Sequence, residues 1–219
     1  MNKFKFAKVL VSPHRRTIQT AINILKSHPQ LEKGITFEIF PYAKEIVNNV
    51  NDLVVSRKEL LDFLENIKKD NPQITFDLSR LDELGCHENL WFLNILQNSD
   101  LREPLIAECM KDPENMDHVL ETVMEVFRKG DGVEGNHGVW LRVQKLKEIM
   151  KKELEGVQLT APNHKILVVT HSRILQTFSA SAFTLDEGVQ QVSQAVVGKG
   201  SLVGARYFQN CEVLPYKAD

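Results

Sequence analysis

Residues 8–21 read Lys-Val-Leu-Val-Ser-Pro-His-Arg-Arg-Thr-Ile-Gln-Thr-Ala, and this stretch decides the fold. Its valine- and leucine-rich start predicts a buried parallel strand over 7–12 that ends in a tight Ser-Pro turn. A helix over 15–27 is expected next, because apolar residues then recur on one helical face. These residues are Ile18, Ala21, Ile22 and Leu25.

A second strand is predicted over 35–40, where it stops at a proline, and it completes a strand–helix–strand unit typical of a parallel sheet. Near the other end, residues 165–170 predict a further buried strand that leads directly into His171. Ligands of open α/β sheets bind at the C-terminal ends of the strands. Arg16 and His171 are therefore expected to face one cleft at that edge.

An arginine beside a helix start and a histidine at a strand end suit a phosphate group. The guanidinium can donate two parallel hydrogen bonds to phosphate oxygens, and the amides of a helix N-terminus add to them. Arg16 could instead be a surface residue, but its charge would then oppose the helix dipole. His171 could instead donate to a backbone carbonyl, and the adjacent Arg15 is expected to point elsewhere on its helix.

The middle of the chain, roughly 50–135, has a different pattern and predicts a helical insertion or cap. Ser56 and Glu59 form a capping-box pattern at the start of its first helix. Further helices are expected over 88–98, 101–110 and 113–128.

The last part of the chain again predicts strands of the sheet and helices that pack against it. The apolar spacing predicts a long helix over 138–155 that Gly156 ends. After the strand that leads to His171, a helix is expected over 173–182. Strands follow over 195–197 and 201–208, with a last edge strand over 211–214. Together these elements predict a three-layer α/β/α sandwich with a mostly parallel sheet, as one domain over 1–219.

Composition excludes several classes of protein. The net charge of −2 argues against nucleic acid as a partner, since duplex binding needs a basic surplus. Cys86, Cys109 and Cys211 are widely spaced, which predicts neither a zinc site nor a disulfide framework and favours a reducing compartment, the cytoplasm. No apolar run is long enough for a membrane span, so no membrane association is expected. The sequence holds no P-loop and no paired metal-ligand spacing, and no metal or cofactor is predicted.

Four segments resemble the histidine phosphatase superfamily, which includes the cofactor-dependent phosphoglycerate mutases. Residues 12–21 are similar to its Ser-Pro-x-x-Arg-x-x-x-Thr-Ala block. Residues 168–171, Val-Val-Thr-His, resemble the strand that carries its second active-site histidine. Residues 41–45 are similar to its Pro-x-x-x-Glu segment, and 198–202 resemble the turn before its last core strands.

The resemblance implies a site for a phosphomonoester, either a phosphorylated small molecule or a phosphoprotein. His171 would stabilise the developing charge on the phosphoryl group, and Glu45 would protonate the leaving oxygen. The same resemblance and the neighbouring sequence assign phosphate contacts to four residues. They are Arg16, Ser12, His14 and Ser172.

One departure from the family concerns its nucleophile. The family begins with a strand bearing Arg-His-Gly, whose histidine becomes phosphorylated, and this tripeptide does not occur here. An enzyme of this type, a phosphatase or mutase, would take its nucleophile from residues upstream of Met1, and residues 1–219 alone are expected to be inactive. The alternatives are an inactive protein that binds a phosphorylated ligand or a partner, and an unrelated α/β binding protein.

The resembled fold places that first strand beside the strand that leads to His171. Its absence leaves three options open: a sheet that closes over the gap, a second chain that fills it, or an incomplete sequence. Self-association therefore stays open. His137 could replace the nucleophile only if its loop folded over the site. The remaining histidines are expected to be solvated. They are His28, His87, His118 and His164.

Overall fold

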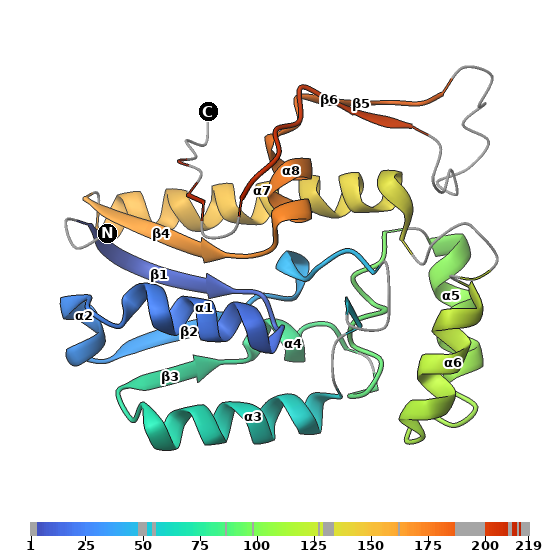
Figure 1. The fold of residues 1–219 in the computed structure, drawn as a ribbon, viewed down its shortest axis with the longest axis horizontal. Helices are drawn as coiled ribbons and strands as arrows, with labels where there is room; N and C mark the ends of the chain where they lie inside the picture. The colour runs from blue at the N-terminus through green and yellow to red at the C-terminus, as the bar shows by residue number, and fades with distance from the viewer. Residues whose placement is uncertain are drawn as a thin grey trace.

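The computed structural model describes residues 4–47, 52–53, 56–85, 87–97, 99–126, 128, 134–161, 163–186, 200–209, 212–213 and 215. Four parallel strands form its sheet in the order β3-β2-β1-β4 (Figure 1). The strands are β1 (Lys5–Val11), β2 (Ile35–Ile39), β3 (Ile74–Asp77) and β4 (His164–Val169).

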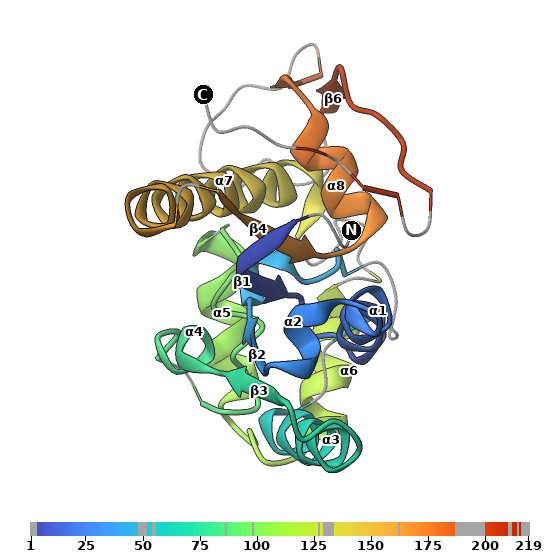
Figure 2. The same cartoon turned by 90° about the vertical axis from the view of Figure 1, so that its left-hand side faces the viewer.

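Helices cover both faces of this sheet. In Figure 2 the strands form a central layer with α1 and α3 on one side and α4 and α7 on the other. The predicted α/β/α sandwich is therefore confirmed. The helices are α1 (Arg15–Leu25), α2 (Pro29–Glu32), the 3-10 helix η1 (Pro41–Ala43), α3 (Arg57–Asp70), α4 (Ser79–Asp82), α5 (Ser99–Cys109), α6 (Met116–Val126), α7 (Gly135–Thr160) and α8 (Ser172–Ser179). Within the described residues, no helix is both long and apolar enough to cross a membrane.

The alternation of β1 divides the apolar interior into two clusters. Val9 and Val11 belong to the cluster that packs under α1, whereas Leu10 belongs to the cluster under α7 and α8. This follows from the strand geometry, in which successive side chains point to opposite faces of a sheet. Both faces of β1 are therefore buried, as the continuous apolar sequence predicts.

The strand that leads to Ser12 lies directly beside the strand that leads to His171. β1 and β4 pair in parallel register, with Val11 opposite Val169, so the sheet is closed between them. The ladder continues one residue further, since the Ser12 amide donates to the Val169 carbonyl at 3.0 Å. β4 forms one end of this sheet as far as the described strands extend.

The region expected to be a helical insertion differs from the prediction in two places. Residues 74–77 form β3, which pairs with β2 and so belongs to the sheet. The capping box of Ser56 and Glu59 is present at the start of α3, as predicted. Within the helix predicted over 88–98, residues 88–95 instead form a series of turns. Four successive apolar side chains are buried there, which a one-faced helix could not achieve. They are Leu90, Trp91, Phe92 and Leu93.

Three boundaries near the end of the chain also differ. α8 ends at Ser179, before the predicted residue 182. α7 continues through Gly156 to Thr160, because Gly156 keeps helical backbone angles and does not adopt the left-handed conformation of a glycine stop. Residues 201–203 form β6, which ends well before the predicted residue 208. The strand predicted over 195–197 lies outside the described residues, and the described part of 211–214 forms no strand.

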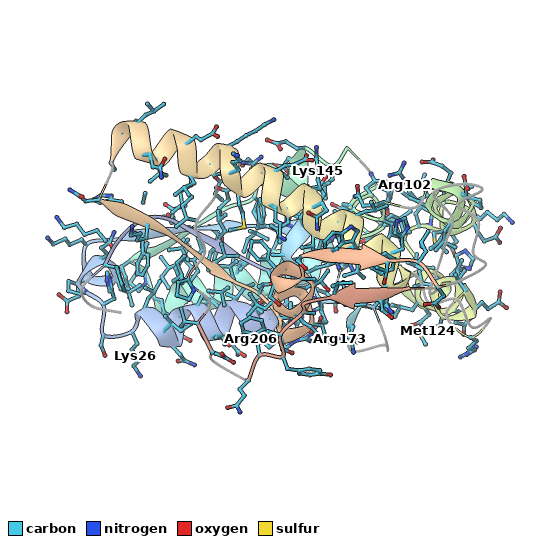
Figure 3. All side chains as sticks on the ribbon, turned by 90° about the horizontal axis from the view of Figure 1, so that it is seen from above. Lys26, Arg102, Met124, Lys145, Arg173 and Arg206 are labelled. Atoms are coloured by element: carbon cyan, nitrogen blue, oxygen red, sulfur yellow. The ribbon has the colours of Figure 1, made fainter. Side chains whose placement is uncertain are left out.

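β6 pairs antiparallel with β5 (Ala182–Thr184), and this hairpin lies alongside the first half of α7 (Figure 3). Phe183 makes the contact, since its ring stacks on Trp140 at 6.3 Å and lies 5.3 Å from the His137 ring. A side chain at Gly200 would meet the Phe183 ring at 2.5 Å, so the turn into β6 requires a residue without a Cβ.

α7 is held to the segment after β2 by a buried arginine. The guanidinium of Arg142, with none of its surface exposed, pairs with Glu134 through two hydrogen bonds. Its remaining nitrogen, Nη1, donates to the carbonyls of Tyr42 at 2.8 Å and Lys44 at 2.9 Å. Arg142 therefore fixes the backbone on both sides of Ala43, directly before Glu45.

We expect the substitution Arg142→Met to lower the free energy of unfolding by about 3–5 kcal/mol, because Glu134 would remain buried without its partner. Arg57→Met provides a control, since its pair with Asp82 is partly exposed and should contribute about 0–1 kcal/mol. Urea unfolding followed by circular dichroism measures both changes. Equal losses in the two variants would contradict this role for Arg142.

Candidate functional site

Five side chains meet where β1 and β4 end and α1 and α8 begin. Ser12, His14 and Arg16 follow β1, His171 follows β4, and Glu45 follows η1. We call this group the His171 cluster. It lies at the C-terminal edge of the sheet, as the sequence predicts for Arg16 and His171, and the two side chains are in contact.

The Ser-Pro turn determines where the histidine of the first segment lies. His14 is the N-cap of α1, with an extended backbone (φ −72°, ψ 136°). Its carbonyl accepts hydrogen bonds from the amides of Thr17 at 3.0 Å and Ile18 at 3.2 Å. The Thr17 hydroxyl also contacts the carbonyls of Ser12 and His14, at 2.8 and 2.6 Å. These bonds hold the turn closed and fix the direction of the His14 side chain.

Both ring nitrogens of His171 have partners. Its Nε2 lies 2.8 Å from the Ser12 hydroxyl oxygen, and the Arg16 Nε donates to its Nδ1 at 3.3 Å. A guanidinium can only donate, so Nδ1 carries the lone pair of a neutral ring. The proton of His171 is then on Nε2, which donates to Ser12.

Glu45 lies beside the same nitrogen of His171. Its Oε1 accepts from the Ile46 amide at 2.9 Å, while Oε2 is 3.4 Å from His171 Nδ1 and 3.9 Å from an Arg16 nitrogen. Burial raises the pKa of Glu45, and the nearby carboxylate of Asp52 raises it further. Such a group could act as a general acid.

His14 packs edge-on against His171, with the ring centroids 4.8 Å apart and an interplanar angle of 81°. The ring is buried, and its Nε2 has no hydrogen-bond partner among the described residues. Burial, together with nearby cations such as Arg16, lowers the pKa of His14 to about 3 and that of His171 to about 2. Both rings are therefore neutral at neutral pH.

Arg16 connects the cluster to the surface. About half of its side chain is exposed, and one guanidinium nitrogen lies 3.5 Å from Asp52. Arg15 points away from the cluster, as expected, and its guanidinium lies over the Phe63 ring at 5.4 Å. The two adjacent arginines therefore have different surroundings, which makes them a matched pair for mutagenesis.

Three other residues considered from the sequence lie outside the cluster. Ser172 is exposed at the first position of α8, where His171 is the N-cap, and it makes none of the described contacts that join the cluster. Arg173 is exposed on α8 (Figure 3). His137 is buried on α7 against Phe183, and no described contact joins it to the cluster.

For one of the other histidines, the structure contradicts the prediction that it is solvated. His28 is buried, not solvated, because it caps α2. Its Nδ1 accepts from the Gln30 amide, and its Nε2 lies 2.9 Å from the Phe4 carbonyl oxygen. The proline that follows it is the usual first residue of a helix, and this was the sequence signal for a cap.

Sequence reasoning missed Lys44, which is buried beside the cluster with 1% of its surface exposed. The signal was its position, between Ala43 and Glu45 in a segment that is otherwise largely apolar. Sequence reasoning also missed Asp52, which pairs with Arg16. The two residues are far apart in the sequence, so no local pattern indicates this pair.

Among the described residues, no group of three or more histidine, cysteine, aspartate or glutamate side chains is arranged to hold a metal ion. Comparison with known proteins found no matching family model, curated protein or solved structure. The functional argument therefore depends on the chemistry of the His171 cluster.

We expect stability to fall as the pH is lowered from 6.5, because the unfolded chain then binds protons that buried His14 and His171 do not. Each histidine should contribute a slope of about 1.4 kcal/mol per pH unit until its folded-state pKa is reached. In the His14→Gln variant, the slope of the unfolding free energy against pH should be smaller by the contribution of one histidine. Urea unfolding between pH 6.5 and pH 4.5 tests this, and equal slopes in the two proteins would contradict it.

Proposed function

We propose that this chain binds the phosphoryl group of a phosphomonoester at the His171 cluster, in the manner of the histidine phosphatases. The observation that carries the proposal is the contact between Arg16 and His171, whose side chains come from neighbouring parallel strand ends. An arginine and a histidine that meet at this edge of an α/β sheet form a favourable site for an anion.

The surrounding groups suit the same ligand. Ser12 and the Nε2–H of His171 are donors in contact with each other, and an anion could accept from both. α1 and α8 begin at the cluster, and the free amides of helix starts favour negative charge. The unpartnered Nε2 of His14 would gain a partner from a bound phosphate.

Turnover would require a nucleophile and an acid. The raised pKa of Glu45 supports the role of the acid that protonates the leaving alcohol oxygen. The nucleophile would come from an Arg-His-Gly strand, as in the resembled family. The protein would then be a phosphatase or mutase acting on a phosphorylated small molecule or a phosphoprotein.

The second candidate function is binding without turnover. It is favoured by the occupied nitrogens of His171, since the lone pair on Nδ1 already accepts from Arg16. A ring held in this way can stabilise an anion, but it is a poor nucleophile. The two candidates share the phosphate site and differ only in whether a phosphoryl group is transferred.

We expect inorganic phosphate to bind, and Arg16→Ala to weaken binding by about 1.5–3 kcal/mol, the usual cost of losing charge-assisted hydrogen bonds. Arg15→Ala should bind phosphate as the unchanged protein does, since Arg15 lies over Phe63. Isothermal titration calorimetry measures all three affinities. Equal affinities in the two alanine variants would overturn the proposed site.

We expect residues 1–219 to hydrolyse para-nitrophenyl phosphate no faster than the Arg16→Ala variant, because a nucleophile of the family type is not among them. A form of the protein extended by an Arg-His-Gly strand should hydrolyse it and carry acid-labile phosphate on the added histidine. Inactivity of both forms would favour the binding function. Turnover by residues 1–219 that His14→Ala or His137→Ala abolishes would contradict this assignment of the nucleophile.

A further inference from the structure

Lys44 is a buried cation whose ammonium has few partners. Its Nζ donates to the carbonyl of Glu45 at 3.1 Å, and no ion pair joins it to a carboxylate in the described part of the chain. An ammonium has three donors, so two remain for a further partner. Burial lowers the pKa of Lys44 to about 8, although the nearby carboxylates of Glu134, Glu45 and Asp52 act in the opposite direction.

The ammonium lies close to the His171 cluster. Its charge is among those that lower the pKa of both His14 and His171, and its own carbonyl is held by Arg142. It adjoins Glu45 in the chain. Because Lys44 is buried and Arg16 is half exposed, the two cations reach the cluster from the interior and from the surface.

The cations around the cluster favour an anion. Arg142 and Glu134 pair with each other. Two further cations, Arg16 and Lys44, lie beside the carboxyl groups of Glu45 and Asp52, and burial raises the pKa of Glu45, which makes a negative charge on it costly. A bound dianion would accept from Arg16 and from the unused donors of Lys44.

A purely structural role explains Lys44 poorly. One hydrogen bond to a carbonyl does not offset the cost of burying an ammonium, and an apolar side chain of similar length would serve the fold at least as well. A ligand that arrives with negative charge explains why a lysine occupies this position.

We propose that Lys44 is a direct ligand of the anion bound at the His171 cluster and donates to it from the buried side. This inference rests on the proposed function, because it assumes that the cluster binds the phosphoryl group. It adds a binding residue outside the segments that resemble known phosphate-binding motifs. It also predicts that the site takes a doubly charged group, since two cations face it.

The test uses inorganic sulfate, which stays a dianion across the pH range of interest. We expect Lys44→Met to weaken sulfate binding at least tenfold at pH 7, as measured by calorimetry, with an unchanged or higher melting temperature. Lys147→Met is the control, since burial also lowers the pKa of this partly buried lysine, but its ammonium lies over the rings of Trp140 and Phe178. Its sulfate affinity should equal that of the unchanged protein.

A second measurement needs no variant. Sulfate affinity of the unchanged protein should be nearly constant up to about pH 7 and fall about tenfold between pH 7 and pH 9, as Lys44 loses its proton. Charged and titratable groups of the His171 cluster and of the segments around it lie near Lys44. They are Arg16, His14, Glu45, Asp52, Glu134, Arg142 and His171.

The outcomes separate the inference from the proposed function. Sulfate binding that is equal in the unchanged protein and Lys44→Met would overturn the role of Lys44 and leave the phosphate site intact. If Lys44→Met does not fold, a sulfate affinity that is constant from pH 7 to pH 9 overturns it in the same way. Failure of the unchanged protein to bind either sulfate or phosphate would overturn the site and the inference together.

Discussion

The parallel pairing of β1 with β4 is the constraint on which the candidate site depends. The hydrogen bond from the Ser12 amide to the Val169 carbonyl extends this pairing one residue beyond β1. This bond holds Ser12 against Val169 at the end of β4. Val169 lies two residues before His171 in the chain. The contact between the Ser12 hydroxyl and His171 follows from this register, since a shift by one residue would turn the side chains to the opposite face.

Loss of water is the common cause of the unusual electrostatics of the site. Burial favours the neutral form of every ionisable group, so it lowers the pKa values of His14, His171 and Lys44 and raises that of Glu45. At neutral pH the two histidine rings are therefore uncharged, although cations lie close to them. A doubly charged ligand would reverse this, because it would favour the protonated forms of the surrounding bases.

The pair of Arg142 and Glu134 links this chemistry to the rest of the fold. By donating to the carbonyls of Tyr42 and Lys44, Arg142 holds the segment after η1 in place. Arg142 lies on α7, and Glu134 directly precedes this helix. The packing of α7 therefore positions Lys44 and Glu45. The hairpin of β5 and β6 in turn covers the first half of α7 through Phe183.

Local patterns predicted the elements that depend on a few neighbouring residues. The apolar strands before Ser12 and His171, the helix after the Ser-Pro turn and the capping box of Ser56 are all present. The prediction failed where burial depends on distant partners. The four apolar residues 90–93 are all buried and lie in turns, and β3 forms because it can pair with the edge of β2.

For the site, the sequence by itself determined which residues end the two strands, and hence that Arg16 and His171 belong to one edge of the sheet. Only the tertiary structure decided that Ser12 and Arg16 occupy the two nitrogens of His171, that His14 packs against it, and that Lys44 is buried beside them. The physical reason is that strand ends follow from local apolar patterns, whereas burial and charge pairing arise between segments far apart in the chain.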